Sequence, residues 1–119
     1  MTGETAKDKG TALVRRLFDI DPTTTGLPEP FLSMTVDHVF GEVWQQPGLG
    51  VEERSLITCA LLAALGREHE LKVHMGGAKR LGHSRQRMEA LMTHVAHYAG
   101  WPAGVGGMRA VAEAWGKDG

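Results

Sequence analysis

The segment from 66 to 77, GREHELKVHMGG, holds the side chains best suited to acid–base or metal chemistry. A zinc protease uses His-Glu-x-x-His, which places two histidines on one helical face with a general-base glutamate between them. Here the second histidine is His74, one residue too late to converge with His69 on a single metal ion. Glu70 and His74, however, are four residues apart and share a helical face.

The Glu70–His74 pair has two interpretations. A carboxylate can hold the charge and tautomer of a neighbouring imidazole, which suits proton transfer near neutral pH. The same spacing also describes an exposed pair that contributes only ~0.2–0.5 kcal/mol to helix stability. The spacing alone is compatible with both.

Four further side chains have a chemical and a structural interpretation. Arg54 stands just before a long apolar run and could hold a carboxylate by a bidentate contact, or could form an ordinary ion pair. Trp44 and Trp101 could wall a pocket or pack in a core or interface. Cys59 lies within the apolar run, where burial raises the pKa of a thiol, so we expect an inert packing residue.

His94 and His97 are three residues apart and can also share a helical face. Two such histidines could form half of a metal site. The simpler expectation is that one faces the core, bonded to a neighbour, and that the other lies at the surface or an interface. We therefore predict no metal site in this protein.

The composition excludes several classes of protein. A chain of 119 residues with a net charge of -1 has no excess of basic residues for nucleic acid or anionic membranes. The single cysteine excludes an internal disulfide and any Cys-x-x-Cys pair. No apolar run approaches the roughly 20 residues of a membrane span, so we expect a cytoplasmic protein.

Apolar periodicity and helix-terminal signals predict an all-α chain with about six helices, and no segment alternates as a strand does. Ser84 is the predicted N-cap of the fifth helix. The third helix is apolar nearly all round, which indicates burial in the core or partly against another subunit. We therefore expect a symmetric homo-oligomer, a trimer or a hexamer. The predicted helices are 11–20, 28–44, 51–65, 67–81, 85–99 and 102–115.

The order of several short motifs resembles the carboxymuconolactone decarboxylase family. These motifs are Gly-x-x-Trp-x-x-Pro-Gly-Leu, Arg-Ser-Leu-x-Thr, Ala-Leu-Gly-Arg, Glu-Leu-x-x-His and His-Val-Ala-x-Tyr-x-Gly-x-Pro-Ala. The resemblance covers about residues 31–115 and implies one domain, 1–119, with the alkylhydroperoxidase D-like all-α fold. The peroxidase branch of that fold carries Cys-x-x-Cys-x-x-x-His, but here the cysteine positions hold Arg67 and Glu70 and only His74 matches. The decarboxylase branch is therefore the closer relative.

The family reaction is loss of CO2 from 4-carboxymuconolactone, an unsaturated lactone that accepts the electron pair itself and needs no cofactor. The resemblance implies that His74, oriented by Glu70, donates a proton or stabilises the oxyanion. It implies that Arg54 anchors a carboxylate, with His94 and Trp44 completing the cavity. The substrate is then a small carboxylated lactone from aromatic catabolism.

The sequence departs from the family pattern at Gly76, where the decarboxylases usually have an arginine, and His97 replaces a usual aliphatic residue. Glycines in mid-helix cost about 1 kcal/mol each relative to alanine, so Gly76 and Gly77 are expected to make room for a ligand or a close helix. One alternative is a biosynthetic enzyme that isomerises, dehydrates or cyclises a larger substrate. Another is a non-catalytic oligomer that binds a small molecule or partner protein.

Overall fold

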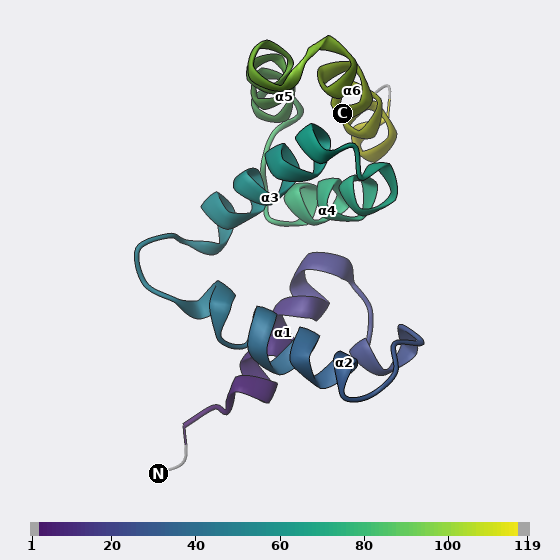
Figure 1. The fold of residues 1–119 in the computed structure, drawn as a ribbon. Coiled ribbons are helices and arrows are strands. Elements are labelled where there is room, and N and C mark those ends of the chain that lie inside the picture. Colours follow the sequence, from purple (N-terminus) through teal and green to yellow (C-terminus); the bar gives the residue numbers. More distant parts are fainter. Residues whose placement is uncertain (1–2, 117–119) are drawn as a thin grey trace. The chain divides into compact units, whose positions relative to one another are not determined.

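The computed structural model describes residues 3–116, and this part of the chain contains six α-helices and no strand (Figure 1). The predicted all-α class is confirmed. The chain divides into two compact units, residues 1–51 and 52–119. The helices are α1 (Ala6–Phe18), α2 (Phe31–Ser33), α3 (Val51–Leu65), α4 (Glu68–Arg80), α5 (Arg85–Ala99) and α6 (Trp101–Trp115).

The first unit is built from α1 and an irregular helical stretch that begins with α2. After α2 the chain continues as a π-helix, Met34–Phe40, and then forms a short 3-10 turn, Val43–Gln45. Gly10 of α1 lies so close to the Val36 carbonyl that a Cβ atom would overlap it, and the helix backbones therefore touch directly. The buried apolar side chains are Leu13, Val14, Leu17, Val36, Phe40 and Trp44.

Both predicted helices of this unit differ from the structure. The first helix starts at Ala6 and not at residue 11, because Thr5 and Asp8 form a capping box at its N-terminus. The predicted helix 28–44 is broken into α, π and 3-10 segments. Gly41 also lies against the Ala6 carbonyl, and this packing of α1 on the helical stretch is a tertiary constraint that periodicity does not report.

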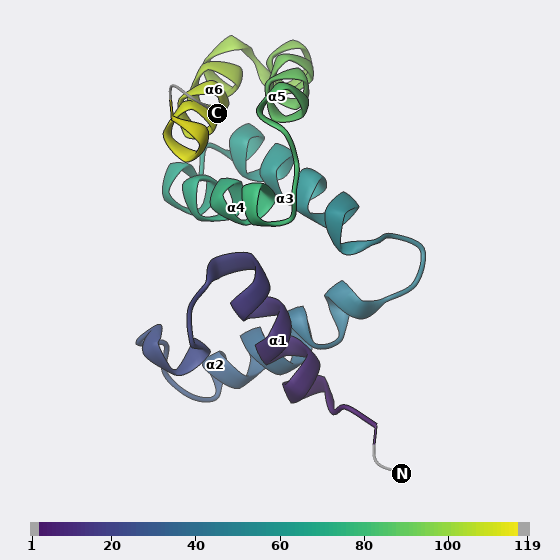
Figure 2. The same cartoon turned by 180° about the vertical axis from the view of Figure 1, so that it is seen from behind.

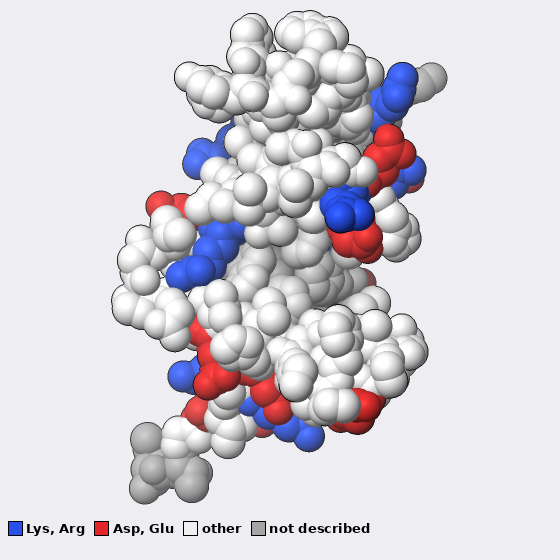
Figure 3. Space-filling view, viewed as in Figure 1, with Lys and Arg blue, Asp and Glu red and all other residues white. Residues whose placement is uncertain are grey.

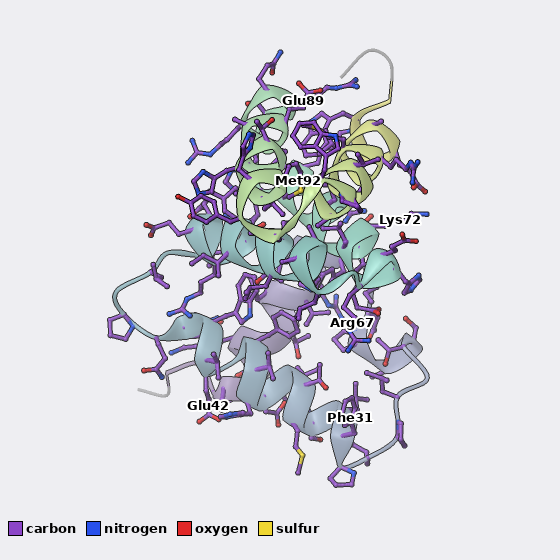
Figure 4. All side chains as sticks on the ribbon, turned by 45° about the horizontal axis from the view of Figure 1, so that its top comes forward. Phe31, Glu42, Arg67, Lys72, Glu89 and Met92 are labelled. Atoms are coloured by element: carbon purple, nitrogen blue, oxygen red, sulfur yellow. The ribbon has the colours of Figure 1, made fainter. Side chains whose placement is uncertain are left out.

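The second unit contains four regular helices, of which α6 packs against both α5 and α4 (Figure 2). Met92 lies between α5 and α6, and Gly104 and Gly107 of α6 leave room for Ala96 and Met92 respectively (Figure 4). The buried core consists of Cys59, Ala63, Leu71, Met75, Ala78, Met88, Met92, Val95, Ala110 and Val111.

The helix boundaries of this unit agree closely with prediction. α3 and α5 match their predicted ranges, and α4 and α6 differ by one residue at their ends. Ser84 caps α5 as predicted, because its hydroxyl accepts a hydrogen bond from the Arg87 N–H at 3.0 Å. Between residues 3 and 116, no helix has the length and apolar character that a membrane crossing needs.

Helix α3 is only half buried. Ser55, Cys59 and Ala63 face the core, whereas Ile57 and Leu61 are exposed. Of its two predicted environments, burial in the core alone does not hold for this chain, and burial partly against another subunit stays a prediction.

Candidate functional site

The Glu70–His74 pair lies on α4, beside a side of the helix that is buried. This burial fixes the direction in which the pair points. Leu71, Met75 and Ala78 are buried in the core of the second unit. Lys72 also forms a 3.3 Å ion pair with Glu113 of α6, which ties the two helices together at the surface. Glu70 then lies in the first turn of α4 and His74 one turn later.

His74 is half buried and Glu70 is largely exposed, with 61% of its side chain accessible. Burial lowers the pKa of His74 below its usual value of 6.5, and the negative charge of Glu70 partly opposes that shift. The carboxylate therefore acts electrostatically on the imidazole, as the shared face predicts. His69, by contrast, is exposed and lies 4.0 Å from Glu70.

Gly76 lies under the guanidinium group of Arg80. A Cβ atom at residue 76 would be 3.3 Å from Nη1 of Arg80, so a side chain there would require the guanidinium to shift. At Gly76 the room expected for a ligand or a close helix is thus used by a side chain of α4 itself. The adjacent Gly77 is buried.

Arg54 lies in the first turn of α3 and is half buried. Thr58 donates a hydrogen bond to the Arg54 carbonyl at 2.7 Å. Nε2 of the buried His83 donates to the Glu52 carbonyl at 3.1 Å, which fastens the turn before α5 to the start of α3. Sequence reasoning missed His83, whose only sequence signal is its place between Gly82 and the N-cap of α5.

Trp44 belongs to the first unit, where it is buried and its ring centroid lies 5.5 Å from that of Phe40. It is thus part of the aromatic core of that unit. Its predicted second role, as a wall of the substrate cavity, stays a prediction.

His94 and His97 are both exposed on α5, so the prediction that one of them faces the core is wrong. His94 stacks on Tyr98 with ring centroids 4.8 Å apart. His97 donates from Nδ1 to the Thr93 carbonyl at 2.7 Å and meets Trp101 edge-on. Each imidazole ring thus contacts a residue of its own helix or a neighbouring aromatic ring. The predicted contact of His94 with substrate stays a prediction.

Cys59 is fully buried, and burial raises the pKa of its thiol to about 12. The predicted packing position is confirmed, and the inertness of the thiol stays a prediction. Among residues 3–116, no three His, Cys, Asp or Glu side chains gather where they could hold a metal ion.

Comparison with known proteins identifies the family. The model of the carboxymuconolactone decarboxylase family matches residues 29–113. The chain is 42% identical to the 4-carboxymuconolactone decarboxylase of Acinetobacter baylyi over 79 residues, which are 66% of this chain and 58% of that protein. It is 32% identical to the nitrosuccinic acid decarboxylase npaB of Metarhizium robertsii over 79 residues, 66% of this chain and 55% of that one.

The chain thus aligns with somewhat more than half the length of each of these relatives. Both the Glu70–His74 pair and Arg54 lie within the range that the family model matches. The resemblance inferred from the motifs is confirmed: the chain belongs to the carboxymuconolactone decarboxylase family.

Proposed function

We propose that this protein is a cofactor-free decarboxylase of an unsaturated lactone of the 4-carboxymuconolactone type. The observation that carries the proposal is the pairing of a half-buried His74 with the Glu70 carboxylate, in a chain 42% identical to an enzyme named for that reaction. Perturbed titratable groups of this kind are typical of active sites.

The proposed reaction requires three contributions from the protein. The departing carboxylate is conjugated through a ring double bond to the lactone carbonyl, so CO2 leaves and its electron pair forms a dienolate. The protein must hold the carboxylate, stabilise charge on the lactone oxygen and supply a proton to a ring carbon. No metal or organic cofactor is required, because the substrate takes up the electrons.

Residues of the second unit can be assigned to these three roles. Arg54 anchors a carboxylate by paired N–H donors. Because burial favours the neutral form of His74, its N–H suits hydrogen bonding to the lactone oxygen, and an anionic substrate would raise the pKa of His74 towards proton donation. Glu70 orients the imidazole, and His94 completes the cavity.

A second candidate is decarboxylation of another acid that carries its own electron acceptor. The 32% identical relative is named for nitrosuccinic acid, whose nitro group can take up an electron pair as a lactone carbonyl does. Arg80, folded over Gly76, adds a positive charge to α4 that could select a different anion.

We further propose that the chain acts in the cytoplasm as a symmetric homo-oligomer, a trimer or a hexamer. The exposed apolar side chains of α3 support assembly, and the single buried thiol of Cys59 is in keeping with a reducing compartment.

The test is incubation of the purified protein with 4-carboxymuconolactone and, separately, with nitrosuccinate, following CO2 release and substrate absorbance. Arg54→Gln should raise KM about tenfold or more, because a charged hydrogen bond to the carboxylate is lost. Arg87→Gln, on the exposed surface of α5, is the matched control and should leave KM unchanged. No turnover of either acid at high enzyme concentration would contradict the proposal.

A further inference from the structure

Helices α5 and α6 border an apolar cavity of about 300 Å³ in the second unit. This volume is at the lower end of the usual range for ligand pockets, roughly 300–1,000 Å³. Figure 3, which has the view of Figure 1, shows a mostly white surface where α5 and α6 lie, that is, a surface with few Lys, Arg, Asp or Glu side chains. The side chains that define the chemistry of the cavity are Met92, Ala96, Trp101, Val105, Met108 and Arg109.

The floor of this cavity is held in place by the packing of α5 on α6. Met92 and Ala96 line the cavity and are buried. A Cβ atom at Gly107 would overlap the Met92 side chain, and one at Gly104 would overlap Ala96, so the two helices are in direct contact there. The cavity therefore lies between elements whose spacing is already fixed.

The two ends of the cavity differ in chemistry. Trp101, Val105 and Arg109 are four residues apart and share one face of α6. The Trp101 ring is 65% exposed and meets the His97 ring edge-on, and His97 is itself bonded to the Thr93 carbonyl at 2.7 Å. At 1.5 Å per residue, about 12 Å of helix separates Trp101 from Arg109. The cavity is therefore aromatic at one end and cationic at the other.

Arg109 is the charged member of the described lining of this cavity. It also borders a polar cavity with Glu68, Lys72 and Glu113, where Lys72 and Glu113 pair at 3.3 Å. These four charges sum to zero, so an anion must be held by direct hydrogen bonds from the guanidinium and not by a long-range field. The five N–H donors of a guanidinium are enough to serve both cavities.

This arrangement favours a ligand with one carboxylate and an apolar chain. A guanidinium binds a carboxylate through two parallel N–H bonds. The unbranched side chains of Met92 and Met108 adapt readily to an alkyl chain. A second carboxylate among the apolar side chains would lose its water without gaining a partner, which disfavours a dianion.

We propose that the cavity between α5 and α6 is a second ligand site, which binds a medium-chain aliphatic monocarboxylate. Its described lining includes neither Arg54 nor the Glu70–His74 pair. His94 is two residues from Met92, which places it about 200° around α5 from the cavity floor. The site is therefore separate from the residues assigned to decarboxylation, and its occupancy does not depend on that function.

The first experiment is calorimetric titration of the purified protein with octanoate and, separately, with the neutral 1-octanol. Arg109→Gln should weaken octanoate binding about tenfold or more and leave 1-octanol binding unchanged, because only a charged hydrogen bond is lost. Arg87→Gln, at an exposed position of α5, is the matched control and should bind both as the wild type does. No binding of octanoate by the wild type, or equal binding by Arg109→Gln, would overturn the site.

The second experiment tests the apolar part of the site. Ala112 lines the cavity and is exposed, so Ala112→Leu fills space without disturbing the core. This variant should weaken binding of both octanoate and 1-octanol about tenfold, because the added carbons displace part of the alkyl chain. Ala90→Leu, at an exposed position of α5 outside the cavity, is the control. Unchanged binding in Ala112→Leu would place the ligand elsewhere and overturn the assignment.

The remaining outcomes separate this site from the other proposals. His74→Gln should retain the wild-type affinity for octanoate, and loss of that affinity would place octanoate in the decarboxylase site. If octanoate does not bind and Ala112→Leu lowers the assembly mass in light scattering, the cavity is covered by another copy of the chain and the ligand site is overturned. Turnover of 4-carboxymuconolactone tests the decarboxylase independently of these titrations.

Discussion

Helices α4 and α5 of the second unit each carry histidines that the sequence made candidates for a site, but their surroundings in the structure differ. On α4, His74 is half buried, and its pKa is lowered by burial and influenced by Glu70. On α5, His94 and His97 are exposed and lie against aromatic rings. Helical spacing made both the Glu70–His74 pair and the His94–His97 pair candidates for a site. Only the burial of His74 beside a charge distinguishes the first pair from the second. Chemistry is therefore best sought where a polar group is partly removed from water.

The largest expected effect is on kcat, and it should differ between a substitution on α4 and one on α5. His74→Gln should lower kcat by about 10²–10⁴, the usual contribution of a positioned acid or base. His94→Gln should lower kcat by less than about tenfold, because its exposed ring supports the cavity at most. Steady-state kinetics on variants with unchanged assembly mass would check this, and equal losses in both would show that α5 contributes as much as α4.

The α5–α6 contact should respond through stability and not through turnover. Gly107→Ala places a methyl group where Met92 now lies and should lower the free energy of unfolding by about 1–3 kcal/mol. Gly106→Ala is the matched control: no atom lies within 4 Å of its Cβ position, and alanine should stabilise the helix by up to about 1 kcal/mol. Denaturant unfolding would measure both, and a neutral Gly107→Ala would show that this contact is loosely packed.

A smaller effect is expected from the partner of His74. Glu70→Gln removes the charge that raises the pKa of His74, so this pKa should fall further and kcat should drop about tenfold. Titration of the imidazole resonances by NMR would follow the pKa. Glu68→Gln, in the same first turn of α4, is the control, and an equal shift in both variants would deny Glu70 a specific role.

The smallest effect is the pH dependence of stability. The folded chain resists protonation of His74, whereas the unfolded chain takes up that proton as the pH falls below about 6.5. The unfolded state then binds more protons, so the free energy of unfolding should decrease from about pH 7 to 5. His74→Gln should make this decrease shallower in parallel urea titrations, and an identical slope would place His74 in a solvent-like environment.

Much of the second unit could be predicted from the sequence because its signals are local. Ser84 before α5 and the long apolar run of α3 gave the correct helix limits. The first unit was harder, because the direct backbone contacts at Gly10 and Gly41 depend on residues far apart in the chain. The capping box of Thr5 and Asp8 was a local signal, but it was overlooked.

The candidate site was predictable only within one helix. The common face of Glu70 and His74 follows from helix geometry. The exposure of His94 and His97 depends on how α5 rotates against α6, which spacing does not determine. The hydrogen bond from His83 to the Glu52 carbonyl likewise joins residues 31 apart in the sequence, so no local pattern predicts it.

The guanidinium of Arg80 above Gly76 has an evolutionary consequence. A single methyl group at residue 76 would make the positive charge of Arg80 give way slightly without altering the net charge of the protein. Substitutions at this uncharged position therefore act on a neighbouring charge through the volume of the new side chain.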